Sequence, residues 1–230
     1  MKALGGPIER SSLKDKVLAI LRKNLITGDL VVGQLYSAAA IAAELGVSTS
    51  PVREALLSLV DQGVMEAVRN RGYRVLPLGE QDRQEIYEMR ALLEIPSMVR
   101  LAGHPDVIAR ESEFRLLADD IVHAVARKDV VAYLESDLAF HLGLLRILGN
   151  DRLVTTVRSL RDQTRQLNLA MQLGSEELTR TAASHISLVD AIVADDAERL
   201  RSLMVEHLEH IRTDWGAVDL APSGSGRAAS

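Results

Sequence analysis

The chain has 230 residues, of which 47% are hydrophobic and 26% charged, enough for two modest domains with packed cores. It has no cysteine, no apolar run as long as a membrane span and no signal-peptide layout, so disulfides, thiolate metal sites and a membrane partner are excluded and we expect a cytoplasmic protein. The net charge of −5 is unevenly divided: residues 1–78 carry 10 Lys and Arg against 7 Asp and Glu, and residues 79–230 carry 17 against 25, a pattern compatible with nucleic-acid contact at one end only.

Residues 10–78 contain the signals of three helices and a hairpin. Ser37 and Ser48 are suited to be N-caps, and Gly46 and Gly63 fit helix ends. Two extended pieces then enclose a turn. We predict helices at 13–27, at 38–45 and between Ser48 and Gly63, and strands at 65–68 and 73–76. This is the order of elements in a winged helix-turn-helix domain.

The third of these helices has the residues expected of a helix that enters the major groove of DNA. Its first turn contains three hydroxyl side chains, which can bind phosphate together with the helix N-terminus, and an arginine that can reach a base edge. The hairpin tip contains two arginines that could follow the minor groove. The candidate DNA-binding residues are Ser48, Thr49, Ser50, Arg53, Arg69, Arg71 and Gly72. The alternative is an ordinary helical subdomain in which Arg53 is only a solvated charge.

A family resemblance favours DNA binding. The string from Gly46 to Leu56, followed by Leu59, Gly63 and the segment 72–75, resembles the signature of the GntR family of bacterial transcription regulators. The resemblance implies that a homodimer binds double-stranded operator DNA at a short inverted repeat. Two positions at which family members often have arginine are Ala39 and Thr49 in this chain, so a different operator sequence is expected.

The second part of the chain, residues 79–215, is predicted to be an antiparallel all-α bundle of six (or seven) helices. Pro77 and Gly79 mark the domain junction, and the Ala-, Gly- and Ser-rich residues 216–230 are predicted to be a disordered tail. The predicted helices span residues 81–102, 105–127, 130–148, 151–173, 176–193 and 196–214. The fold class is therefore mainly α.

Four side chains are predicted to point into this bundle as a divalent-metal site. Asp137 and His141 are four residues apart on one helix, and His185 and His207 each lie on an apolar helix face. Zinc suits imidazole ligands and is the ion we expect, and Ni, Mn or Fe could also occupy such a site. The alternatives are hydrogen-bonded core histidines and, one turn from His207, His210 as the ligand.

The same residues carry a second resemblance. Segments 90–94 and 137–141, with His185 and His207, are similar to the FCD ligand-binding domain of FadR-type GntR regulators. The resemblance covers residues 80–215 and implies that Asp137, His141, His185 and His207 hold a divalent cation. Six helices would indicate the VanR-like branch.

This subgroup senses small organic acids, and Arg90 is the candidate cation for the effector carboxylate. The alternative for Arg90 is a salt bridge to Glu94, four residues on, at the bundle surface.

The resulting hypothesis is a dimeric regulator in which an effector at the metal shifts the bundle or the 77–80 junction. One rival is a metal-dependent hydrolase or lyase with a fused nucleic-acid-binding domain, although the sequence has no H-E-x-x-H or G-x-S-x-G motif. Another is a metal-free bundle that binds a partner protein while the first domain binds DNA constitutively.

Overall fold

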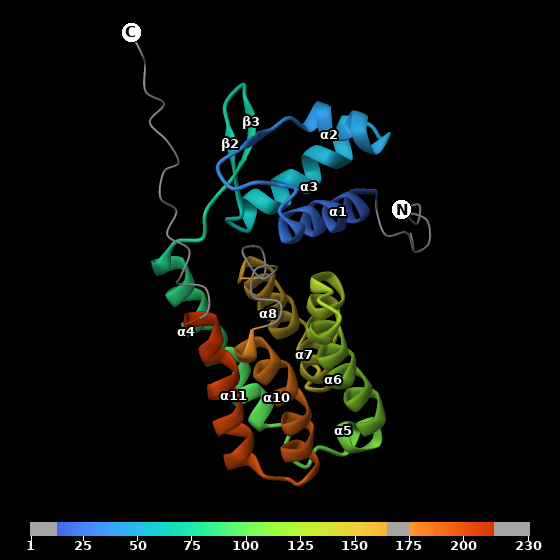
Figure 1. Cartoon of the computed structure of the whole chain (residues 1–230), viewed down its shortest axis with the longest axis vertical. Coiled ribbons are helices and arrows are strands. Elements are labelled where there is room, and N and C mark those ends of the chain that lie inside the picture. Colours follow the sequence, from blue (N-terminus) through green and yellow to red (C-terminus); the bar gives the residue numbers. More distant parts are fainter. Residues whose placement is uncertain (1–12, 165–174, 214–230) are drawn as a thin grey trace, which may run out of the picture.

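The computed structural model describes residues 13–164 and 175–213, the last four of them by their backbone only. A winged domain lies at one end and a helical bundle at the other (Figure 1). The predicted tail and the end of the predicted helix 151–173 lie outside the described residues. Among the helices that are described, none is long and apolar enough to cross a membrane.

The helices of the winged domain agree with the sequence prediction. They are α1 (Leu13–Thr27), α2 (Ala38–Leu45) and α3 (Thr49–Asp61). The Ser37 side chain accepts a hydrogen bond from the Ala40 amide, and Gly46 ends α2 in the left-handed conformation that glycine adopts most readily. Residues of α1 and α3, including the fully buried Leu56, form the domain's own apolar core.

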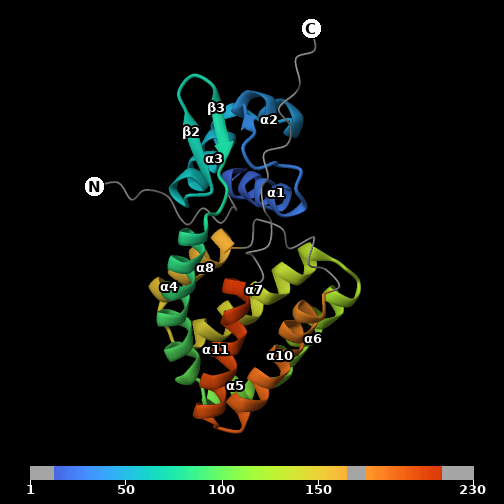
Figure 2. The same cartoon turned by 60° about the vertical axis from the view of Figure 1, so that its left-hand side comes forward.

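The sheet of this domain has one strand that the sequence prediction missed. The predicted hairpin is present as β2 (Met65–Val68) and β3 (Gly72–Val75), and the two-residue β1 (Leu35–Tyr36) pairs with β3 on its free side. Two residues are too few for a period-2 pattern, so β1 exists only because the chain between α1 and α2 runs beside β3. In Figure 2 the hairpin projects away from the bundle.

Among the described residues, 80–164 and 175–213 form the bundle. Its described helices are α4 (Glu80–Val99), α5 (Pro105–Ala109), α6 (Glu111–Ala126), α7 (Val130–Ile147), α8 (Asp151–Thr164), α10 (Glu176–Val193) and α11 (Ala197–Thr213). The predicted helix 105–127 is divided in two because Arg110, with φ −112° and ψ 20°, leaves the helical conformation. The described part of the bundle thus has seven helices, one of them only five residues long.

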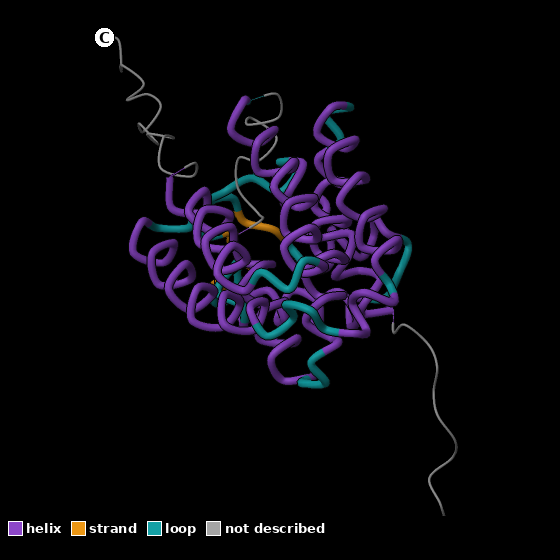
Figure 3. Tube along the Cα trace, turned by 90° about the horizontal axis from the view of Figure 1, so that it is seen from below, coloured by secondary structure: helices purple, strands orange, loops and turns teal. Residues whose placement is uncertain are grey.

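The packing of the bundle brings distant segments of the chain to one centre. Helix α11 packs on α4 and α10, α10 on α6, α6 on α7, and α8 on both α4 and α7. Figure 3, seen from the bundle end, shows these helices around a common interior, with the small sheet behind them. An apolar cluster that includes Phe114, Phe140 and Leu188 fills most of that interior. Seven of the buried polar side chains gather at one place in the bundle: Arg90, Glu94, Asp137, His141, Arg161, His185 and His207.

Candidate metal centre and nucleic-acid interface

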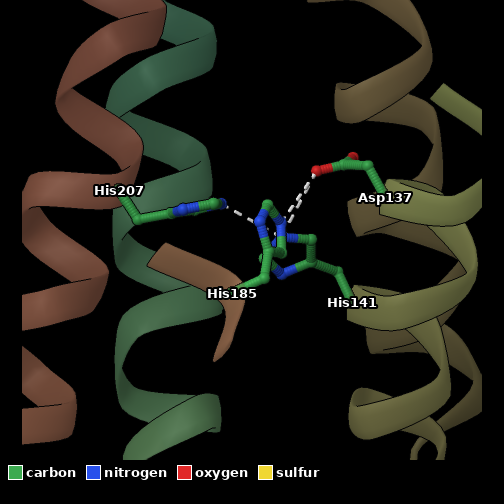
Figure 4. Close-up of side chains that lie close together, drawn as sticks. All are labelled: Asp137, His141, His185 and His207. Atoms are coloured by element: carbon green, nitrogen blue, oxygen red, sulfur yellow. Dashed lines mark hydrogen bonds and ion pairs between the residues drawn. The ribbon is translucent and has the colours of Figure 1, made fainter. Parts of the chain in front are cut away.

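The four predicted ligand side chains meet in the bundle interior. Asp137 and His141 come from α7, His185 from α10 and His207 from α11, and all four are buried (Figure 4). One ligand atom from each lies within 4.8 Å of all the others. The Nε2 atom of His141 is 3.1 Å from Nε2 of both His185 and His207, and Asp137 Oδ1 is 3.3 Å from Nε2 of His185.

Hydrogen bonds fix the tautomer of His185. Its Nδ1 lies 3.1 Å from the Thr181 carbonyl oxygen and 3.0 Å from that of Ala182. A carbonyl can only accept a hydrogen bond, so Nδ1 must carry the proton. In the neutral ring the lone pair is then on Nε2, the atom that faces the centre.

His207 is fixed in the same way through a serine. The Ser184 hydroxyl donates its single proton to the Thr181 carbonyl over 2.7 Å, so toward His207 Nδ1, 2.9 Å away, it can only accept. His207 therefore carries its proton on Nδ1 and directs the Nε2 lone pair at the centre. Ser184 positions this ring without touching the centre itself.

His141 completes the set of nitrogens. Burial, followed by the nearby Arg161 guanidinium, lowers its pKa to about 3, so the ring is neutral at neutral pH. Its Nδ1 is buried and has no hydrogen-bond partner among the described residues.

These observations test whether a metal ion fits the centre. Two nitrogens on one tetrahedral Zn²⁺, each about 2.0–2.1 Å from the ion, lie about 3.3 Å apart, close to the 3.1 Å between the histidine Nε2 atoms. Lone pairs from two differently anchored rings converge on one point, where a cation would stabilise them. The donor set of three imidazoles and one carboxylate is typical of zinc and other transition-metal sites. The residues present fit such an ion.

Beside these four residues lies a buried ion-pair network that the sequence prediction missed in part. Arg161 of α8 donates through Nη1 to Asp137 Oδ2 over 3.1 Å and through Nε and Nη2 to Glu94. Arg90 donates through Nε to the other Glu94 oxygen over 2.6 Å. The Arg90–Glu94 salt bridge therefore exists, but its expected position at the bundle surface is wrong, since both side chains are buried.

Arg161 could have been found from helix periodicity. It follows Val154 and Val157 at the i, i+3, i+7 spacing of one helix face, and both valines are buried. A charged residue on an apolar stripe needs a buried partner of opposite charge.

Glu94 and Arg90 keep their charges at neutral pH. Burial alone would raise the pKa of Glu94, but the Arg161 and Arg90 guanidinium groups outweigh it and hold that pKa at about 2. Burial and the like charge of Arg161 lower the pKa of Arg90 to about 10, still well above neutrality. Two arginines, Arg90 and Arg161, thus form ion pairs with two carboxylates, Glu94 and Asp137, beside three histidines.

At the other end of the molecule, four of the seven predicted DNA-binding residues, Arg53, Arg69, Arg71 and Gly72, line one groove. Arg53 of α3, the start of α2 and the hairpin tip with Arg69 and Arg71 enclose about 660 Å³. All three arginine side chains are exposed. Ala39, one of the two positions singled out by the family resemblance, also lines the groove. The groove is the right kind of surface for a nucleic-acid backbone.

The three predicted hydroxyl residues at the start of α3 differ in exposure and in hydrogen bonding. Ser48 is the N-cap residue, yet its side chain makes no capping hydrogen bond and is exposed. Ser50 is exposed and donates to Glu54 over 3.2 Å, and Thr49 is half-buried. Ser48 thus has the hydroxyl best placed for an outside partner.

Gly72 shapes the hairpin. It has a φ of +121°, and a Cβ atom there would lie 2.3 Å from the Tyr36 carbonyl oxygen. Only glycine lets β1 approach β3 this closely.

A winged helix-turn-helix domain with a basic groove, joined to a helical domain with a buried polar centre, defines a DNA-binding regulator with two domains. The sequence matches the profile of the FCD domain over residues 85–210 and that of bacterial regulatory proteins of the gntR family over residues 13–75. The chain belongs to the gntR family of transcription regulators and has an FCD domain as its second part. These families contain regulators rather than enzymes, so the hydrolase or lyase alternative is set aside.

Known relatives are similar along most of their length. An uncharacterized HTH-type transcriptional regulator in an unstable DNA locus of Streptomyces ambofaciens is 29% identical, over 84% of this chain and 81% of its own. The gluconate operon transcriptional repressor of Bacillus subtilis is 27% identical, over 87% of this chain and 82% of its own. Among solved structures, E. coli McbR/YncC has the same fold, with a TM-score of 0.75 and 23% identity over 90% of this chain and 98% of that one.

Proposed function

We propose that the chain binds operator DNA under the control of a small organic acid, which binds at or near a divalent metal ion held by Asp137, His141, His185 and His207. The observation that carries the proposal is the convergence of these four buried side chains, two of them with anchored tautomers, beside a charge-balanced ion-pair network. Zinc is the ion we favour, with Ni, Mn or Fe as alternatives.

Charge balance explains why the effector would be an acid. The guanidinium groups of Arg90 and Arg161 are already balanced by Glu94 and Asp137. A divalent cation adds two positive charges to this buried place, which is costly without an anion. An organic carboxylate supplies the missing charge, and when bound the metal acts as a Lewis acid for one of its oxygens.

Arg90 is the residue we assign to the effector carboxylate. It engages Glu94 through Nε, and the terminal nitrogens of a guanidinium can grip a carboxylate with two parallel hydrogen bonds. Arg161 lies in the same network and is a second candidate. One relative is named for the gluconate operon, and gluconate is a carboxylate, which agrees with this class of effector.

For the DNA we propose that Ser48, Thr49, Ser50 and Arg53 enter the major groove, while Arg69, Arg71 and Gly72 form a wing over the backbone or minor groove. A homodimer would present two such domains to the half-sites of an inverted repeat. We take residues 10–78 and 79–215 as the two domains and the cytoplasm, where the operator is, as the location. Two relatives are named as repressors of operons, and we propose the same mode here.

The test is a titration of small organic acids against the full chain bound to a labelled operator, with bound metal and after its removal by a chelator. We expect an acid to change operator affinity only when metal is present, and H185A to abolish the response. H123A, at an exposed histidine of α6, is the matched control and should respond as the wild type does. Effector binding by calorimetry that is unchanged after complete metal removal would refute the metal's role. A wild-type chain that no acid affects would favour constitutive DNA binding.

A further inference from the structure

Two neighbouring residues of α8 point to different domains. Arg161 is directed into the bundle, where it forms ion pairs with Asp137 and Glu94. The next residue, Asp162, forms an ion pair with Arg22 on α1 of the winged domain, with 3.0 Å between Nη2 and Oδ2. The Asp162 side chain is only 8% exposed and that of Arg22 is 26% exposed, so water screens this pair less than it screens a pair at the open surface.

Arg22 extends the line of contacts to the helix proposed to read DNA. Its Nη2 also donates to Gln62 Oε1 over 3.3 Å, and Gln62 is the C-cap residue of α3. Ile26, one turn after Arg22 on α1, packs against the apolar core of the bundle. A continuous path of polar contacts thus runs from Asp137, through one peptide unit of α8, to the end of α3.

The end of α8 also lies against the chain that connects the two domains. Gln163 together with Gly63, Val64 and the segment 75–78 surrounds a space of about 20 Å³. Such a space holds about one water molecule. The last turn of α8 is therefore packed between the bundle, the end of α3 and the segment that follows the wing, and Figure 1 shows it directed at α1.

We propose that the last turn of α8 transmits the occupancy of the buried centre to the DNA-binding domain through the Asp162–Arg22 ion pair. The inference rests on the proposed function, because it needs a cation at Asp137. That cation competes with Arg161 for the Asp137 carboxylate, and an anionic effector offers Arg161 a new partner. In a close-packed interior, a shift of Arg161 displaces the turn that carries it.

Asp162 and Gln163 move with that turn. The ion pair of Asp162 with Arg22 and the packing of Gln163 near the end of α3 therefore change. The coupling is reciprocal: DNA binding must change metal affinity by the same factor by which the metal changes DNA affinity.

The experiment compares the full wild-type chain with D162N and R22Q. Zn²⁺ affinity is measured by competition with a chelating dye, and DNA affinity by fluorescence anisotropy on a duplex selected from a random pool, with Zn²⁺ or with EDTA. In the wild type we expect Zn²⁺ to change DNA affinity by about 5- to 150-fold, the usual range for coupled sites. Without DNA, each variant should bind Zn²⁺ within about twofold of the wild-type affinity. The factor by which Zn²⁺ changes DNA affinity should fall, on a logarithmic scale, to half of the wild-type value or less.

Two further variants test whether the effect is specific to the Asp162–Arg22 ion pair. D120N removes a carboxylate exposed on α6 and should keep the full effect of Zn²⁺. The double variant R22Q/D162N should lose no more coupling than R22Q alone, because R22Q already removes the ion pair that D162N breaks. Hydrogen exchange of α1 and of residues 62–64, measured with and without Zn²⁺, reports the same coupling without DNA. It should change in the wild type and in D120N, but not in D162N or R22Q.

The failures are distinguishable. Variants that retain the whole Zn²⁺ effect on DNA affinity and on hydrogen exchange overturn the α8 route and leave the proposed function standing. A wild-type chain that binds Zn²⁺ with no change at α1 or in DNA affinity also overturns the route. A wild-type chain that binds no divalent metal refutes the metal part of the proposed function itself.

Discussion

Glu94 is the residue whose substitution tests the buried network most directly. Its carboxylate is fully buried and lies between the guanidinium groups of Arg90 and Arg161. In E94Q the side chain keeps its size but loses its charge, so two buried cations share only Asp137. The loss of one member of such a network is expected to destabilise the fold strongly.

The magnitude follows from the pKa of Glu94. It is about 2 in the folded chain against an ordinary value of 4.5. Since a tenfold change in a dissociation constant corresponds to about 1.4 kcal/mol, the ionised carboxylate stabilises the fold by roughly 3 kcal/mol. The usual cost of breaking a buried ion pair, about 3–5 kcal/mol, is of the same size.

The pH dependence has a definite sign. Because the pKa of Glu94 is lower in the folded than in the unfolded chain, its stabilisation is complete above pH 4.5 and is lost as the pH falls towards 2. The difference in the free energy of unfolding between wild type and E94Q should therefore be greatest at neutral pH. It should shrink by about 1.4 kcal/mol for each pH unit below 4.5.

The assay is urea unfolding followed by helical circular dichroism, in chelator so that bound metal does not contribute. E88Q, an exposed carboxylate on the same helix that accepts from Gln84, is the control and should change stability by less than about 0.5 kcal/mol. If E94Q lowers the free energy of unfolding by less than about 1 kcal/mol at pH 7, below the range for a broken buried pair, the ion pairs of Glu94 do not stabilise the bundle appreciably.

Three other substitutions test separate parts of the molecule. S184A should weaken Zn²⁺ binding about tenfold or more, because no side chain then fixes the tautomer of His207. S202A on α11 is the control and should not weaken it; equal Zn²⁺ affinities of S184A and the wild type, measured with a chelating dye, would contradict the role given to Ser184. G72A places a Cβ atom against the Tyr36 carbonyl and should lower the melting temperature and operator affinity, and a chain with unchanged melting would show that the hairpin can relax. R53A should reduce operator affinity about tenfold or more with unaltered metal affinity; if anisotropy shows no loss, Arg53 does not contact DNA.

Local signals in the sequence determined most of the elements. N-cap side chains such as Ser37, a left-handed glycine such as Gly46 and the period of the apolar residues act within one or two turns, so they can be read from neighbouring residues. The spacing of Asp137 and His141 is equally local, since one turn of α7 puts both on the same face. The limit of such signals appears at Arg110, where one residue outside the helical conformation divides a predicted helix.

Tertiary structure decided what these residues do together. The contact of His141 with His185 and His207 joins positions 44 and 66 residues away, and it depends on how α7, α10 and α11 pack. The burial of the Arg90–Glu94 pair depends on α8, because Arg161 supplies the second cation. No local rule can determine charge partners 67 residues apart, since burial and the direction of each side chain are properties of the assembled core.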